Sequence, residues 1–134
     1  MILADTDVLI DFLLDRSPVA EQITQDVEAD RLWTTAVTCF ELLTGAEEGK
    51  RGDKVRQLVQ SLNVLPLDLP AAQRAAEVRR YLESTGPAIG MADSLIAGTA
   101  LLHDLPLLTR NRSHFERVPG LSLVPIGIGR PKRR

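Results

Sequence analysis

The chain has 134 residues, of which 44% are hydrophobic and 25% charged, and its formal net charge is −2. These values predict one soluble globular domain with a hydrophobic core, and they exclude a chain that binds polyanions over its whole surface. No apolar run approaches the roughly 20 residues of a membrane span, no basic segment opens a signal peptide, and the single cysteine permits no internal disulfide, so we expect a cytoplasmic protein.

The N-terminal stretch combines a short apolar run with a carboxylate and a helical pattern. Residues 2–4 are apolar and end at Asp5, after which apolar residues recur at helical spacing. This predicts a buried strand, an acidic corner and a helix, with Asp5 at the carboxyl end of the strand, where parallel α/β sheets bind ligands. We expect Asp7 to cap the helix and Asp11, one turn later, to be solvated.

The remainder of the chain alternates between short apolar runs and amphipathic segments. Ser17 is predicted to cap a helix opening at Pro18, Thr38 to open another, and residues 49–52 to form a loop. The alternation predicts a parallel sheet covered by helices on both faces. We expect further strands at 32–34, 64–67 (an edge strand because of Pro66), 105–108 and 121–124, and further helices at 55–62, 70–83 and 91–102. Residues 1–126 form the predicted single domain, and residues 127–134 form a flexible basic tail.

Three carboxylates stand at comparable points of this pattern. Asp5 ends the first strand, Glu41 lies in the first turn of a helix after a strand, and Asp93 lies at the start of the buried helix. If the sheet brings these ends together, three like charges converge and require a cation. Carboxylate oxygens suit Mg²⁺ or Mn²⁺, and such a site favours metal-assisted hydrolysis of a phosphate ester.

Each of these acids also has a plain structural interpretation. The run from Thr38 to Glu41 matches a capping box, in which Glu41 accepts from a backbone N–H. Asp93 in the first turn of a helix is favoured by the helix dipole. Spacing alone therefore leaves both the metal site and the structural roles open.

The ordered set of motifs resembles PIN-domain nucleases, in particular the VapC-type toxins of bacterial toxin–antitoxin pairs. The resemblance covers nearly the whole chain and occurs in the family's order. It is carried by residues 2–11 around Asp5, residues 38–45 around Glu41, residues 90–97 around Asp93, and residues 109–115.

The resemblance implies a three-layer α/β/α sandwich with a short-stranded, mainly parallel sheet. It implies a Mg²⁺- or Mn²⁺-dependent endoribonuclease with Asp5, Glu41 and Asp93 as metal ligands and catalytic residues, and with Thr6 and Thr109 orienting the site. The family usually forms homodimers, cleaves structured RNA such as tRNA or rRNA, and is blocked by a cognate antitoxin.

The fourth motif departs from the family pattern and carries most of the nearby basic residues. His114 stands where the family often has an aspartate, which puts a second metal in doubt; we expect a partly buried imidazole that pairs with a backbone carbonyl. Asn111 is the remaining polar catalytic candidate. Arg110, Arg112 and Arg117 either contact RNA phosphates or belong to a solvated loop.

Two alternatives compete with the nuclease. A haloacid-dehalogenase-type phosphatase would use Asp5 as nucleophile and Asp7 as acid, with later roles for Thr34 or Thr35, Lys50 or Lys54, and Asp93. A non-catalytic module that binds RNA or protein on a degenerate nuclease fold is the other alternative.

Overall fold

A computed structural model describes residues 1–127 and contains four strands and seven helices in that range. The strands are β1 (Ile2–Ala4), β2 (Leu32–Thr35), β3 (Asn63–Leu65) and β4 (Leu107–Leu108). The helices are α1 (Thr6–Leu13), α2 (Val19–Glu28), α3 (Ala36–Thr44), α4 (Lys50–Ser61), α5 (Leu69–Thr85), α6 (Met91–Leu102) and α7 (Arg112–Phe115). Of the predicted basic tail, residues 128–134 lie outside the described residues.

The four strands form one parallel sheet in the order β3-β2-β1-β4, which confirms the predicted parallel arrangement and the edge position of β3. Each pair of consecutive strands is connected by two helices. Strands β1, β2 and β3 are added to the sheet in one direction, and β4 then pairs with the other side of β1. The strand order therefore reverses between β1 and β4. Such a topological switch point is where parallel sheets bind ligands.

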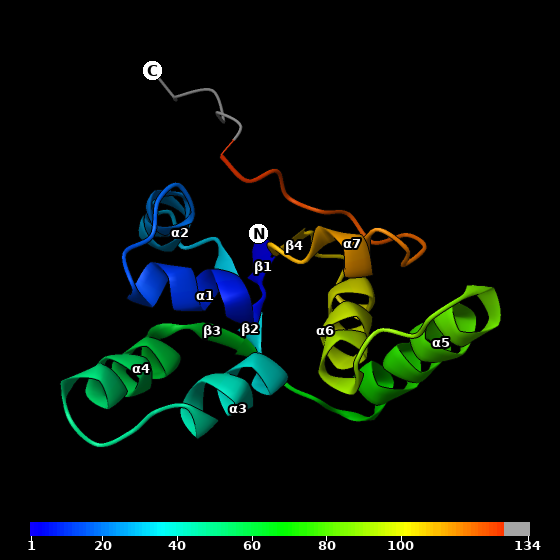
Figure 1. Ribbon diagram of the computed structural model, residues 1–134, viewed down its shortest axis with the longest axis horizontal. Coiled ribbons are helices and arrows are strands. Elements are labelled where there is room, and N and C mark those ends of the chain that lie inside the picture. The colour runs from blue at the N-terminus through cyan, green and yellow to red at the C-terminus, as the bar shows by residue number, and fades with distance from the viewer. Residues whose placement is uncertain (128–134) are drawn as a thin grey trace.

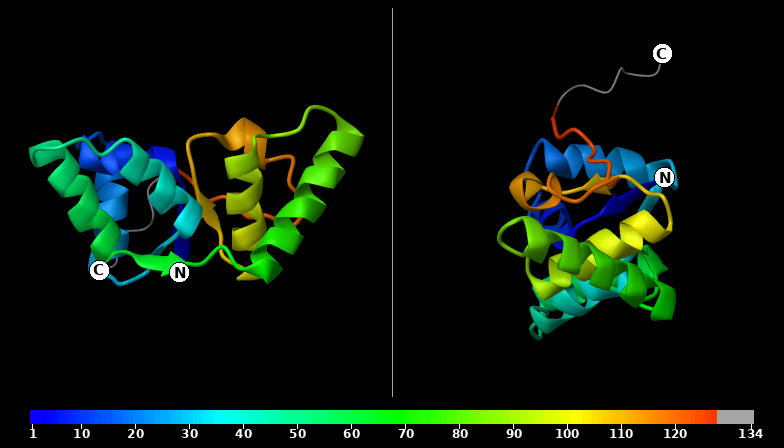
Figure 2. Two further views of the ribbon diagram at one scale, coloured as in Figure 1. Left: turned by 90° about the horizontal axis from the view of Figure 1, so that it is seen from below. Right: turned by 90° about the vertical axis from the view of Figure 1, so that its right-hand side faces the viewer.

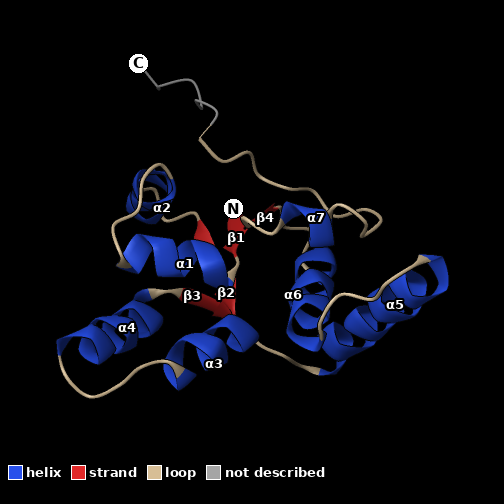
Figure 3. Ribbon diagram, in the orientation of Figure 1, coloured by secondary structure: helices blue, strands red, loops and turns tan. Residues whose placement is uncertain are grey.

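Helices cover both faces of the sheet, as Figures 1 and 2 show. Alternate side chains of β1 face opposite sides because successive residues of a strand point in opposite directions. Ile2 and Ala4 belong to a core shared with α1, α2 and α4, while Leu3 belongs to a second core shared with α5 and α6. The predicted three-layer α/β/α sandwich is confirmed, with strands between two helical layers (Figure 3).

Helices α5 and α6, which share the second core, pack closely against each other. Gly98 lies in α6 where an added Cβ would stand 2.4 to 2.7 Å from the backbone and Cβ of Ala75 in α5. No side chain larger than hydrogen fits between the two helices at this position. The glycine therefore sets the distance at which α5 covers α6.

Several local predictions are wrong for identifiable reasons. The predicted loop at 49–52 is instead the N-cap and first turn of α4. Gly52 lies in this turn against the carbonyl oxygen of Glu47, and only glycine fits there, because an added Cβ would lie 1.6 Å from that oxygen. Ser17 does not cap α2: Pro18 occupies the cap without a side-chain bond, and the Ser17 hydroxyl donates to Glu21. The segment 121–124 contributes only one parallel bridge, from Leu123 to β4.

Among the helices of residues 1–127, none has the length and the apolar composition that a membrane span requires.

Candidate functional site

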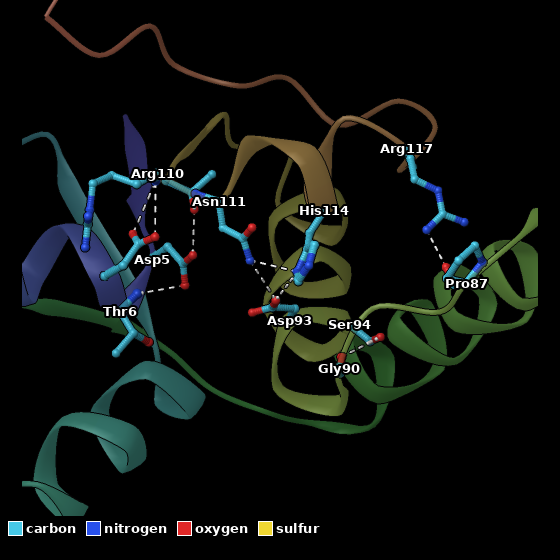
Figure 4. A network of polar contacts seen from close by, with 12 residues as sticks. Asp5, Thr6, Pro87, Gly90, Asp93, Ser94, Arg110, Asn111, His114 and Arg117 are labelled. Atoms are coloured by element: carbon cyan, nitrogen blue, oxygen red, sulfur yellow. Dashed lines mark hydrogen bonds and ion pairs between the residues drawn. The ribbon is translucent and has the colours of Figure 1, made fainter.

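Asp5 occupies the carboxyl end of β1 and is 5% exposed. Its backbone is extended and makes Asp5 itself the N-cap of α1, so the prediction that Asp7 caps this helix is wrong. One carboxylate oxygen, Oδ1, accepts from the backbone N–H of Thr6 at 2.7 Å, and the other accepts from the Thr109 hydroxyl at 2.7 Å. Since Thr109 directly follows β4, the carboxylate of Asp5 connects the carboxyl ends of the neighbouring strands β1 and β4. Figure 4 shows Asp5 beside Thr6 at this edge of the sheet.

Glu41 reaches the same region from α3. This helix begins at Ala36 with Thr35 as its cap, so Glu41 lies in the second turn and the capping box predicted from Thr38 does not form. The carboxylate instead accepts from the hydroxyl of Thr6 at 2.7 Å, through Oε1. Thr6 therefore contacts two of the three predicted acids, through its backbone N–H and through its side chain.

Asp93 lies in the first turn of α6, as predicted, and points toward the fourth motif. Its Oδ2 accepts from the side-chain amide of Asn111 at 3.4 Å and lies 3.1 Å from Nδ1 of His114. His114 is about half exposed and also lies 2.7 Å from the Asn111 amide nitrogen. The prediction that its imidazole pairs with a backbone carbonyl is therefore wrong, and the ring stands beside Asp93.

These contacts join the three acids into one continuous polar chain. Glu41 and Asp5 are linked through Thr6, and Asp5 is linked to Thr109. The Thr109 hydroxyl in turn accepts the backbone N–H of Asn111 at 3.0 Å, and Asn111 contacts Asp93. The sheet and the loop after β4 thus bring together the four motifs that the sequence singled out.

The electrostatics of the site favour a cation. Burial, together with the nearby charges of Asp7 and Asp93, raises the pKa of Asp5 from 3.8 to about 7, although the bonds from Thr109 and Thr6 oppose the rise. Burial also raises the pKa of Asp7, against the opposing contribution of Arg110. The site therefore holds more negative charge than its own hydrogen bonds neutralise.

The donor set fits a hard divalent cation. Asp5, Glu41 and Asp93 offer only carboxylate oxygens, the ligand type that Mg²⁺ and Mn²⁺ prefer. In residues 1–127, however, no three His, Cys, Asp or Glu side chains converge closely enough to hold a metal ion. The side chains around Asp5 are instead drawn to their hydroxyl and amide partners.

Asp11 and Arg110 form an ion pair that the sequence interpretation missed. Asp11 was expected to be solvated, but it is 4% exposed and its Oδ2 lies 2.8 Å from Nε of Arg110. Arg16 adds a longer contact of 3.6 Å to Oδ1. The backbone N–H of Arg110 also donates to both carboxylate oxygens of Asp7, at 3.2 and 3.3 Å. Asp7 and Asp11 are four residues apart and therefore lie on one face of α1. This spacing was the feature of the sequence that could have indicated a shared cationic partner.

The three arginines predicted to contact RNA occupy different surroundings. Arg110 is held against α1, and Arg112 lies near Glu116 at 3.8 Å and donates to the Val124 carbonyl. Arg117 lies away from the acids, where its guanidinium donates to the carbonyls of Leu82 and Pro87 (Figure 4). The structure therefore does not gather the three into one surface, and Arg117 anchors the end of α5.

The sequence matches the PIN domain family over residues 2–121. Among curated relatives, a tRNA(fMet)-specific endonuclease VapC of Shigella flexneri is 30% identical over 121 residues, covering 87% of this chain and 91% of that protein. Ribonuclease VapC10 of Mycobacterium tuberculosis is 34% identical over 115 residues, covering 86% of each chain. Among solved structures, the DNA-bound VapBC of Salmonella typhimurium is 27% identical with a TM-score of 0.78, covering 92% of this chain and 98% of that chain.

Proposed function

This chain belongs to the PIN domain family, and on that premise we propose that it is a divalent-metal-dependent endoribonuclease, the toxin of a VapC-type toxin–antitoxin pair. The observation that supports this most directly is the polar chain from Glu41 through Asp5 to Asp93 at the carboxyl edge of the sheet. The relatives' names as ribonucleases give the chemistry that this arrangement of acids serves.

Asp5, Glu41 and Asp93 are the residues that would hold Mg²⁺ or Mn²⁺. When bound there, the cation supplies Lewis acidity that neutralises charge developing on a phosphodiester during hydrolysis. Thr6 orients Asp5 and Glu41 together, and Thr109 orients Asp5 from the opposite side. These short bonds fix the direction of the carboxylate oxygens before substrate arrives, so less reorganisation is needed in the reaction.

Asn111 and His114 complete the site at Asp93. The Asn111 amide donates to the carboxylate and so holds it without adding charge. The imidazole, where the family often has a fourth acid, adds a polar group that is neutral or cationic. With no fourth carboxylate among these contacts, we propose one metal ion per site rather than two.

The substrate and partners follow from the relatives. Transfer RNA is the substrate to test first, because the Shigella flexneri relative is named for tRNA(fMet) cleavage. The VapBC complexes among the structural neighbours support a cognate antitoxin as the inhibiting partner. A homodimer is supported by the apolar side chains of Phe40 and Met91, which are 67% and 71% exposed beside one cavity of about 350 Å³.

The phosphatase alternative has less support than the nuclease. The Thr34 hydroxyl donates to the Ala4 carbonyl inside the core, and Thr35 caps α3, so neither is free for catalysis. Both carboxylate oxygens of Asp7 accept the backbone N–H of Arg110, so the residue that this reaction would need as its acid is already engaged in a structural contact. The match to the PIN domain family removes the remaining ground for this assignment.

The test is cleavage of bulk transfer RNA by antitoxin-free protein in EDTA, Mg²⁺ or Mn²⁺. We expect discrete products with either metal, none in EDTA, and none from Asp5→Asn. The matched control is Glu83→Gln, an exposed carboxylate on α5 that should leave cleavage unchanged. Cleavage that persists in Asp5→Asn would refute the site, and a folded protein that cleaves no RNA with any metal would favour the non-catalytic module.

A further inference from the structure

Two cavities open from Glu41 in different directions. The first, of about 330 Å³, lies between α1, α3 and α4, and the second, of about 350 Å³, lies between α3, the segment before α5, and α6. Both include Glu41 in their lining. A polymer cleaved at this carboxylate has to pass along a surface next to it, so these two cavities are candidate paths for the polymer.

The two cavities differ in charge. Arg51 and Lys54 line the first, whereas the lining of the second contains no lysine or arginine. Both cations lie on α4, three residues apart, and therefore share one helix face. Within residues 1–127 neither makes an ion pair, in contrast to Arg56 on the same helix, which contacts Asp53 at 2.7 Å.

The interior of the first cavity is apolar beneath this basic rim. Ile10 and Leu14 of α1 line it and are 40% and 47% exposed. Apolar surface of this kind can pack against the faces of bases or ribose rings, while unpaired cations bind phosphates. Apart from Glu41, the residues that line the second cavity are apolar, which suits another protein surface better than a polyanion.

We propose that the cavity lined by Arg51 and Lys54 is a phosphate-binding subsite for the RNA strand next to the scissile bond. The proposal rests on the proposed ribonuclease function and adds the direction in which the substrate leaves Glu41. Arg51 and Lys54 contact the RNA backbone and not the reacting phosphate. They therefore contribute to binding and to its salt dependence, while the rate of the bound complex depends on the acids.

The experiment measures binding of bulk transfer RNA at several salt concentrations in Mg²⁺, in the Asp5→Asn background that blocks cleavage. Each lost phosphate contact removes roughly 0.7 to 0.9 from the slope of log K against log salt, so Arg51→Ala with Lys54→Ala should reduce the slope by about 1.5. At about 0.15 M salt this corresponds to roughly 15-fold to 20-fold weaker binding. The charge-conserving pair Arg51→Lys with Lys54→Arg should restore the slope.

A matched control separates local contacts from net charge. Arg79→Ala with Arg80→Ala removes two exposed cations from α5, at the opposite end of the molecule from α4 (Figure 1). This control should leave the slope of log K against log salt unchanged.

Cleavage kinetics give a second measurement. When Arg51→Ala and Lys54→Ala are made in the protein that keeps Asp5, kcat should stay within about twofold of the wild-type value while KM rises.

The outcomes are distinguishable from failure of the proposed function. If the wild-type protein cleaves RNA but the α4 variant keeps the full salt slope, the subsite is refuted and the nuclease stands. An equal loss of slope in the α5 control would also refute it. If the α4 variant binds RNA normally but no longer binds an antitoxin peptide, the cavity is a protein-binding surface. If wild-type protein neither binds nor cleaves RNA, the proposed function and the subsite fail together.

Discussion

Replacing Asp5 with asparagine should make the metal-free protein more stable at alkaline pH while it removes activity. Burial raises the pKa of Asp5 from 3.8 to about 7, which corresponds to about 4 kcal/mol between the two protonation states. Because this pKa is raised on folding, the folded state holds the proton that the unfolded chain releases between about pH 4 and pH 7. The free energy of unfolding of the wild type therefore falls with rising pH across that interval and levels off above it.

Asparagine keeps the shape of the side chain and carries no charge. Its oxygen can accept from the Thr6 N–H, and its amide can donate to the Thr109 hydroxyl, whose present bond to Asp5 is 2.7 Å. The variant therefore avoids the free-energy cost of ionising a buried acid near Asp7 and Asp93. It also keeps two hydrogen bonds, one with the Thr6 N–H and one with the Thr109 hydroxyl. We expect Asp5→Asn to gain up to about 4 kcal/mol relative to wild type between pH 4 and pH 8.

Urea titrations of both proteins in EDTA at several pH values measure this difference directly. The control is Glu83→Gln on the surface of α5, which should shift stability by less than about 0.5 kcal/mol at every pH. A wild-type–variant difference that does not change with pH, or a variant less stable than wild type at pH 8, would refute the reasoning. In that case the hydrogen bonds from Thr6 and Thr109 stabilise the carboxylate more than burial and the neighbouring charges destabilise it.

Three further substitutions test other parts of the structure. Asp11→Asn should lower the free energy of unfolding, measured in urea titrations, by about 1 kcal/mol. The loss should be smaller in an Arg110→Gln background, because the half-exposed Arg110 is the main partner of Asp11. Equal losses in both backgrounds would show that the two residues are not coupled. Gly98→Ala should cost about 1 to 3 kcal/mol, seen as a lower Tm, because the new methyl group meets Ala75; an unchanged Tm would mean that α5 moves freely. Glu41→Gln should abolish metal-dependent RNA cleavage. Its Tm should change little, because the amide oxygen of glutamine can still accept the hydroxyl of Thr6. Cleavage at the wild-type rate would exclude Glu41 from the site.

The elements with long apolar periodicity were predictable from sequence. The helix at 91–102 has the predicted ends because it is apolar nearly all round and is bounded by Gly90 and His103. The parallel sheet followed from the alternation of strands and helices, which depends on many residues at once. Short elements were harder: the two residues of β4 and the single bridge at Leu123 contain too few residues for a pattern.

The places of the candidate acids in the fold were largely predictable, but their hydrogen-bond partners were not. Asp5 follows β1 and Asp93 lies in the first turn of α6, so the local pattern was enough to place both. Glu41 was placed on the right helix but one turn too early, because α3 begins at Ala36 and not at Thr38. The partners depend on backbone geometry at single residues, as when Asp5 rather than Asp7 takes the extended conformation of the cap. The burial of Asp11 depends on Arg110, which lies 99 positions further along the chain and reaches it only through the fold.

The bond between Thr109 and Asp5 joins residues 104 positions apart, and it forms only after β4 has paired with β1. During synthesis of this chain, Asp5 leaves the ribosome before β4 and Thr109, which complete its surroundings and emerge more than a hundred residues later. Such long-range pairing is slow to form because a long loop has to close first. We therefore expect the nascent chain to remain inactive until Thr109 has emerged and β4 has paired with β1, so that the RNAs engaged in its own translation are not exposed to a working nuclease before that point.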